Sequence, residues 1–296
     1  MAKRSSSKKA SKHYPVQRKI TLRETGSPQT NDTQMQVLVD RELSHINHRL
    51  YRQSRVYNCK VEIDSSLATG MAVDVYALSD TWMNMKAYQF AKKTYDKNSA
   101  EELDAISKSN IGRWNDFRVQ MSATTTVANM RAIGHNIVNY ENIDDGDYET
   151  TIVTDAAGVE HVMAWVGSGT EAFNIIDEYD RTGDTAYSPT FPQNVVGYAD
   201  LDDQIDSDMV DHLTGQGNEP PYADRELENA CFSKVGRLFV DGEGQGKLST
   251  GFFDAPCGMI LLIGSGGATS ITLSDSLTVV CKAGDYKGVH APSYLE

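Results

Sequence analysis

Five aspartates within residues 200–208 form the densest group of carboxylates in the chain. Carboxylate oxygens at this density suit a hard cation, so a structural Ca²⁺ site is one interpretation. The spacing does not follow an EF-hand loop, because the glycine at its sixth position and the glutamate at its twelfth are both missing. A solvated acidic loop is therefore the preferred interpretation. The weak metal candidates are Asp200, Asp202, Asp203, Asp206 and Asp208.

A glycine-rich segment over residues 241–248 has the composition of a phosphate-binding or metal-binding loop. A P-loop would need glycine where Asp241 stands, and serine or threonine where Leu248 follows the lysine. A calcium loop that begins at Asp241 would end at Phe252, whose side chain cannot bind a cation. The segment instead predicts a flexible turn between two strands.

The histidines do not complete a catalytic or metal site in the sequence. His45 and His48 have the spacing to share a helix face, but no third ligand or carboxylate base lies near them. The nucleophile motif G-x-S-x-G and the zinc motif H-E-x-x-H are both absent from the sequence. We therefore expect no enzyme. The remaining histidines are His13, His135, His161, His212 and His290.

Four cysteines are widely separated and form no C-x-x-C pair, so neither a zinc ribbon nor a redox pair is indicated. Two of them fit alternating strand patterns, which favours buried thiols over a disulfide, although a disulfide stays open. The cysteines are Cys59, Cys231, Cys257 and Cys281.

Basic residues are concentrated at the N-terminus, where the first 23 residues carry eight of them and no carboxylate. The whole chain has a net charge of −13, so residues 24–296 carry −21. The opening residues, 3–12, have almost no apolar side chains, and we expect residues 1–24 to form a disordered arm. Eight charges would neutralise about eight phosphates without reading a base sequence. The basic residues are Lys3, Arg4, Lys8, Lys9, Lys12, Arg18, Lys19 and Arg23.

The arm has three interpretations: a nucleic-acid-binding arm, a nuclear-localisation patch, or a solvated tail without a partner. It does not have the apolar core of a secretory signal.

The rest of the chain, residues 25–296, is expected to be a single, mainly β domain. Nothing in it approaches 18 consecutive apolar residues, so we expect no membrane insertion. Period-two alternation bounded by Gly, Asn, Asp and Ser marks eight or nine strands, which favours a sandwich or barrel. The predicted strands cover residues 56–63, 71–78, 117–125, 150–154, 159–166, 236–240, 257–263, 270–273 and 277–282.

A helical insertion is predicted over residues 79–110. Its first helix, over 79–97, would begin at a Ser79 or Asp80 cap, and a second would begin at Ser99. The first helix would bury one face. Trp82 and Trp114 are interpreted as core or interface anchors and not as a platform for bases, because no basic cluster surrounds them. The predicted buried face consists of Met83, Ala87, Phe90, Ala91 and Thr94.

Residues 141–228 hold 22 acidic residues and only two arginines, together with many turn-forming residues. We expect long exposed loops around the strand at 159–166. Loops of this length are usually functional or form an outer surface, and their charge would keep that surface away from nucleic acid.

This organisation resembles the coat proteins of small icosahedral viruses. Three stretches, residues 43–56, 113–119 and 283–292, look like coat proteins of small single-stranded DNA viruses from aquatic environments. The resemblance implies an eight-stranded antiparallel jelly-roll sandwich whose arm points inward to the genome and whose loops point outward. Further arginines would extend the positive inner surface. They are Arg41, Arg49, Arg52 and Arg55.

The sequence therefore predicts a capsid protein that assembles with itself into an icosahedral shell and packages single-stranded nucleic acid, DNA more than RNA. Its location would be the virion, and the host nucleus or cytoplasm during assembly. Two alternatives remain open: a tail or accessory virion protein, and a non-viral β-sandwich binding module. The second would bind a ligand such as carbohydrate through Tyr187, Tyr198 or Tyr222.

Overall fold

The computed structural model forms two compact units, each assembled from separate parts of the sequence. Unit 1 comprises Met1–Leu78, Val127–Tyr148 and Lys234–Glu296, and unit 2 comprises Ser79–Thr126 and Glu149–Ser233. The region predicted to be a helical insertion, residues 79–110, belongs to unit 2 together with Glu149–Ser233. The structure describes residues 15–24, 34–64, 71–105, 114–122, 128–135, 140–142, 150–154, 158–167, 172–179, 231–240, 247–265 and 277–295.

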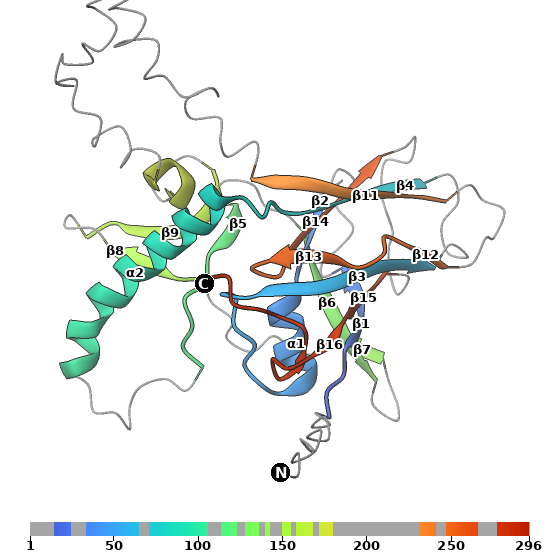
Figure 1. Cartoon of the computed structure of the whole chain (residues 1–296), viewed down its shortest axis with the longest axis horizontal. Helices are drawn as coiled ribbons and strands as arrows, with labels where there is room; N and C mark the ends of the chain where they lie inside the picture. Colours follow the sequence, from blue (N-terminus) through green and yellow to red (C-terminus); the bar gives the residue numbers. More distant parts are fainter. Residues whose placement is uncertain are drawn as a thin grey trace, which may run out of the picture. The chain divides into compact units, whose positions relative to one another are not determined.

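Unit 1 is mainly antiparallel β-sheet, as the sequence predicts, and has one short helix, α1 (Val39–Asn47) (Figure 1). Its strands are β1 (Lys19–Glu24), β2 (Gln34–Leu38), β3 (Val56–Asp64), β4 (Met71–Leu78), β6 (Ala128–His135), β7 (Tyr140–Asn142), β11 (Phe232–Val240), β12 (Lys247–Ser249), β13 (Phe253–Pro256), β14 (Met259–Ser265), β15 (Leu277–Cys281), β16 (Ala283–Gly284) and β17 (Gly288–Val289).

The strands of unit 1 follow the order β11-β4-β14-β2-β6-β1-β15-β3-β12, with β13 also on β3 and β7 also on β6. From β4 to β12 the neighbours are antiparallel except for β2 and β6, which are parallel. Alternate side chains of β3, including Tyr57 and Val61, are fully buried. They share one hydrophobic core with Val75 of β4 and Leu262 of β14. Strands from both ends of the order thus contribute to one core, as in a β-sandwich.

The predicted disordered arm is wrong for its last six residues, which form β1. β1 lies between β15 and β6, and its residues Ile20 and Leu22 are buried. Apolar residues that alternate with polar ones bury one face of a strand, so Lys19–Glu24 belongs to the folded unit.

Several strands were predicted well, among them β3, β4, β9 and β15. Of the predicted strand at 117–125, the described residues form a strand at β5 (Gln120–Ser122), and residues 123–125 lie outside the described residues. The strand predicted from residue 257 begins at Met259, because Cys257 and Gly258 form a turn with positive φ angles. The prediction at 270–273 lies outside the described residues.

Unit 2 pairs a long helix, α2 (Trp82–Ala105), with a small sheet of order β10-β9-β5, in which β8 also pairs with β9. The further strands are β8 (Ile152–Thr154), β9 (Glu160–Val166) and β10 (Ala172–Asn174). Its core contains stacked aromatic rings. Tyr88 of α2 lies parallel to Trp165 of β9 at 6.0 Å between ring centroids, and edge-on to Phe117 at 5.4 Å.

The helix differs from its prediction in three ways. Thr81 caps its start, because Thr81 Oγ1 accepts a hydrogen bond from the Asn84 N–H at 3.3 Å. It runs through Ser99 without a break, and the Ser99 hydroxyl donates back to the Tyr95 carbonyl.

The third difference is the buried face of α2. Asn84, Tyr88 and Ala91 are buried, whereas Phe90 is 50% exposed and Thr94 is also exposed. The predicted face was therefore wrong at Phe90 and Thr94. Trp82 and Trp114 are 64% and 53% exposed and do not lie in the core. Neither of the two helices named here combines the length and the apolar character that a membrane crossing needs.

Candidate nucleic-acid interface

Residues 48–55, after α1, pack against the C-terminal segment of unit 1. The helix ends at His48, which has a left-handed φ of 49°. The chain then contacts residues 286–293: the Tyr51 hydroxyl donates to the Lys287 carbonyl at 2.9 Å, and the Tyr286 hydroxyl accepts from the Arg52 N–H at 3.1 Å. Two of the three coat-like stretches, 43–56 and 283–292, are thus in contact.

Two tyrosines form the apolar base of this contact. Tyr51 is fully buried and meets Tyr286 edge-on, with 6.0 Å between the ring centroids. Burial raises the pKa of Tyr51, and nearby Arg49 and Arg18 only partly oppose this. The Tyr51 hydroxyl therefore keeps its proton at neutral pH and stays a donor to the Lys287 carbonyl.

Cationic side chains surround Tyr286. The Arg55 guanidinium lies 4.4 Å from the centre of the Tyr286 ring, and Lys287 Nζ lies 5.2 Å from it. Arg18 reaches the same segment, since its Nη1 donates to the Gly288 carbonyl at 3.3 Å. We name this group the Tyr286 patch. Its cations are Arg18, Arg55 and Lys287, which make these contacts, together with Arg49 and Arg52 of the adjoining segment 48–55.

The Tyr286 patch has the chemistry of a phosphate-binding surface. Arg49 and Arg52 are exposed, and Arg55 is half-buried. Asp285 is the one carboxylate in residues 48–55 and 282–291. Guanidinium groups bind phosphate through paired N–H donors, and a partly exposed tyrosine ring offers a surface on which a base can stack.

The eight predicted arm residues have different positions. Arg18 belongs to the Tyr286 patch, and Lys19 is exposed at the start of β1. The backbone of Arg23 pairs with Arg131 inside the sheet. The other five, which are Lys3, Arg4, Lys8, Lys9 and Lys12, lie outside the described residues.

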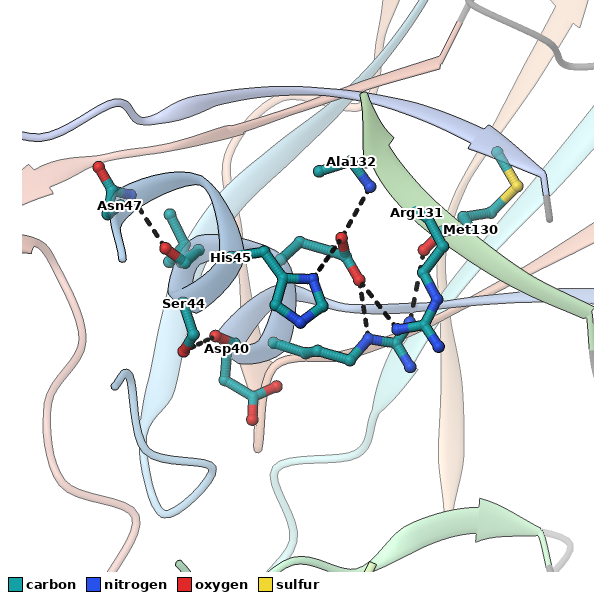
Figure 2. A network of polar contacts seen from close by, with 10 residues as sticks. Asp40, Ser44, His45, Asn47, Met130, Arg131 and Ala132 are labelled. Atoms are coloured by element: carbon teal, nitrogen blue, oxygen red, sulfur yellow. Dashed lines mark hydrogen bonds and ion pairs between the residues drawn. The ribbon is translucent and has the colours of Figure 1, made fainter. Parts of the chain in front are cut away.

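Arg41 does not join the patch, although the sequence groups it with Arg49, Arg52 and Arg55. It is only 4% exposed, and its Nε donates to Glu42 Oε1 at 2.7 Å (Figure 2). Its Nη2 lies 3.5 Å from the Met130 carbonyl. The Arg41 charge is thus compensated by a buried carboxylate inside unit 1.

Glu42 is the centre of this buried network, and its partners His45, Arg131 and Ala132 are labelled in Figure 2. Its Oε2 accepts the Ala132 N–H at 2.7 Å and lies 3.8 Å from His45 Nδ1, and Arg131 Nη1 lies 3.7 Å from its Oε1. Burial by itself raises the pKa of Glu42. His45, Arg41 and the Ala132 N–H outweigh burial and leave that pKa below its usual value. Glu42 therefore stays ionised and joins α1 to β6.

A glycine fixes the start of α1 against the β13–β14 turn. The Val39 N–H donates to the Gly258 carbonyl at 2.8 Å. Gly258 has a φ of 67°, and a Cβ there would lie 3.1 Å from the backbone nitrogen and Oδ1 of Asp40. A side chain at this position would strain the backbone and displace α1.

The sequence did not single out Tyr51, Tyr286 or Lys287. Their signal was present, because tyrosines alternate with basic residues in both LYRQSR and YK. Interleaved aromatic and basic residues are typical of single-stranded nucleic-acid sites. The pairing of the two segments, 230 residues apart, was not readable from either one alone.

Some of the other candidate site residues lie within the described residues, and the rest lie outside them. The aspartates at 200–208, the alternative ligand tyrosines 187, 198 and 222, and the glycine-rich residues 241–246 lie outside the described residues. Within the described residues, no group of three His, Cys, Asp or Glu side chains could hold a metal. His45 contacts Glu42, while His48 ends α1. All four cysteines are buried free thiols, the interpretation that the sequence favoured over a disulfide.

Comparison of the chain with protein-family models, curated proteins and solved structures finds no match.

Proposed function

We propose that this chain is a structural capsid protein that assembles into an icosahedral shell and packages single-stranded nucleic acid. In this proposal unit 1 is a jelly-roll sandwich, the basic arm and the Tyr286 patch bind the genome, and the acidic loops face outward. Single-stranded DNA is the proposed genome. The observation that carries the proposal is the patch itself, because Arg18 joins the end of the arm to cations of the folded unit.

The strand pairing supports the jelly-roll part of the proposal. β3 pairs with β15, and β4 pairs with β14, both antiparallel. In chain order these four strands are nested: the first pairs with the last and the second with the one before it. A jelly roll has this nesting, because it forms when a long antiparallel hairpin folds over on itself.

Charge supports the nucleic-acid part. The patch and the arm are positive in a chain whose net charge is −13, so both are suited to phosphate. Contacts to phosphate give affinity that falls steeply with salt and does not depend on base sequence.

The test of packaging uses two forms of the protein, the full chain and a truncation that starts at Pro15. The truncation removes five cations and keeps β1, whereas a start at residue 25 would delete the buried Ile20 and Leu22. For single-stranded DNA, the slope of log K against log salt should become less negative by about 3 to 4 in the truncation. An unchanged slope would contradict the role of the arm.

The test of assembly is electron microscopy of the purified protein with single-stranded DNA across pH and salt. Closed shells are expected. Rings or fibres would point to a tail or accessory protein instead. A monomer under every condition, with ligand binding that ignores the arm, would point to a β-sandwich binding module.

A further inference from the structure

The helix α2 carries a stripe of aromatic and lysine side chains on its exposed side. Trp82, Lys86, Phe90, Lys93 and Lys97 follow one another at spacings of three or four residues, which places them on one helix face. Trp82 and Phe90 are 64% and 50% exposed, and the three lysines are exposed as well. We name these five residues the α2 stripe. It lies opposite the buried residues of the helix.

The α2 stripe is a positive and partly apolar surface. Among the described residues, Lys93 and Lys97 have no ion-pair partner, whereas Lys92 beside them binds Asp96 at 2.6 Å. Lys86 reaches the neutral Gln89 at 3.4 Å. Large exposed aromatic residues next to exposed lysines indicate a surface that a partner with apolar and acidic side chains would cover.

Both ends of a long acidic segment of this chain are anchored at α2. Before the segment, the Tyr179 ring meets Phe90 edge-on, with 6.2 Å between centroids. After it, the Cys231 carbonyl accepts from the Ser79 N–H at 2.7 Å and from Asn84 Nδ2 at 3.2 Å. Residues 180–230 between these anchors contain twelve acidic and two basic residues, so their charge is complementary to the stripe.

One part of this segment also has a matching apolar pattern. Leu201, Ile205, Met209 and Leu213 recur every fourth residue, which would place them on one side of a helix. Aspartates fill the positions between them. They are Asp202, Asp203, Asp206, Asp208 and Asp211.

We propose that residues 201–213 dock onto the α2 stripe of the same molecule, with their apolar side chains on Trp82 and Phe90 and their aspartates beside the lysines. The 22 residues from Tyr179 to Leu201 can span up to about 70 Å, and α2 is about 36 Å long, so every part of the stripe is within reach. Tethering at both ends gives an effective concentration in the millimolar range, which favours docking within one molecule. The inference does not depend on the capsid proposal.

The docking has a consequence for the predicted calcium site. Aspartates that pair with Lys86, Lys93 and Lys97 have their charge compensated by the protein. The cluster then needs no cation, and the acidic segment contributes to the order of unit 2.

Zero-length carbodiimide cross-linking tests the docking and its source. A mixture of ¹⁵N-labelled and unlabelled full-length protein is cross-linked at low salt and analysed by mass spectrometry. Cross-links from Lys93 or Lys97 to Asp202–Asp211, within one isotopic copy, are expected, and their yield should fall at high salt. Cross-links between differently labelled copies only, or none to this segment, would overturn the proposal.

Fluorescence of Trp82 gives an independent readout. In a Trp114→Phe background two tryptophans remain, and because Trp165 is fully buried, the acrylamide-quenchable fluorescence is that of Trp82. This quenching is compared between the parent, a deletion of 201–213, and a variant with all five aspartates changed to asparagine. Both changes should raise the quenching to the same level. A control changes Glu219, Asp224, Glu226 and Glu228 to their amides, and it should leave the quenching near that of the parent.

Two results would contradict the docking: equal quenching in the parent and the deletion, or an equal rise in the control. Near-UV circular dichroism of the buried Tyr88–Trp165 stack shows whether each variant keeps the fold of unit 2. Exchanging the charges of the two surfaces completes the test. Changing Lys86, Lys93 and Lys97 to Glu should release the segment and raise the quenching of Trp82. Changing Asp202, Asp206 and Asp208 to Lys in the same protein should restore it.

Discussion

Four arginines of unit 1 lie within 15 residues of one another in sequence, but one of them is buried and the other three are exposed or half-buried. Arg41 is buried against Glu42, and its charge supports the packing of α1. Arg49 and Arg52 are exposed, and Arg55 lies over the Tyr286 ring at 4.4 Å. This comparison shows that the number of basic residues in a sequence overestimates the positive charge that is exposed for binding a partner.

The physical reason lies in the cost of removing charges from water. A buried arginine loses its hydration and persists only when a carboxylate and carbonyl groups replace the water. Glu42 and the Met130 carbonyl do this for Arg41. An exposed arginine keeps its hydration, so it can exchange water for phosphate at little cost. Burial therefore decides which arginines stabilise the fold and which are available for binding.

The largest expected effect is on the buried side of this comparison. Glu42→Gln should lower the free energy of unfolding by about 3–5 kcal/mol, because it leaves the Arg41 guanidinium buried without its counter-charge. Urea unfolding followed by circular dichroism measures the loss.

The matched control is Glu62→Gln. Glu62 pairs with Lys60 at 2.5 Å on the half-exposed face of β3. Partly exposed pairs contribute little, so the control should cost no more than about 1 kcal/mol. Similar losses for the two variants would show that the network of Glu42 is not a special support of α1.

A smaller effect is expected on the exposed side. Changing Arg49, Arg52 and Arg55 together to Gln should make the slope of log K against log salt for single-stranded DNA less negative by about 2. Fluorescence anisotropy with a labelled oligonucleotide across a salt series measures this slope.

The reciprocal variant is Arg41→Gln, which should destabilise unit 1 and leave the salt slope unchanged in the fraction that folds. A change in slope for Arg41→Gln, with none for the triple variant, would reverse the assignment of the two sets. Arg49 and Arg52 are exposed, so their substitution should alter stability by no more than about 0.5 kcal/mol each. Loss of the half-buried Arg55 also removes its contact with the Tyr286 ring, at a cost of about 1 kcal/mol, so the triple variant should stay folded.

Features that depend on neighbouring residues were predictable from the sequence, whereas features that depend on contacts between distant segments were not. The alternation in β3 and β15 is local, so the sequence predicted both strands and their buried thiols. The sequence did not predict β2, because a strand of five residues gives only a short alternating pattern. Its partner β14 lies more than 200 residues further along the chain, so the pairing could not be predicted from the residues of β2.

The candidate site shows the same limit. The sequence singled out Arg18, Arg49, Arg52 and Arg55, because residue type and charge are visible in one segment. It missed Tyr286, because its role depends on contact between segments about 230 residues apart. It misassigned Arg41, because the carboxylate next to it in sequence does not reveal that both are buried. Residue chemistry was thus predictable, and burial and long-range pairing were not.

Acid should weaken the buried network before it affects the arginines of the patch. Glu42 has a lowered pKa in the fold, so the unfolded state binds more protons as the pH falls below its ordinary value of 4.5. Its stabilisation is therefore complete above that pH and is lost as the pH falls through the lower pKa of the folded state. The free energy of unfolding, measured from pH 6 downward, should fall less steeply in Glu42→Gln than in the wild type; parallel curves would contradict the assignment.

The smallest expected effect concerns the buried thiols of unit 1, which should not react with a thiol reagent while the protein is folded. Cys59 and Cys281 lie opposite each other on β3 and β15, and both are buried. Burial raises the pKa of Cys281 to about 12 and raises the pKa of Cys59 well above its usual value, so neither forms the reactive thiolate at pH 8. The native protein should therefore react with a thiol-specific disulfide reagent only as fast as it unfolds, whereas denatured protein should react at once. Since Glu42→Gln lowers the stability of the same unit, it should speed this reaction, and the triple arginine variant should not. Fast labelling of Cys59 and Cys281 in the native wild type would show that β3 and β15 open locally, and that the core beside the patch is less firmly packed than its burial indicates.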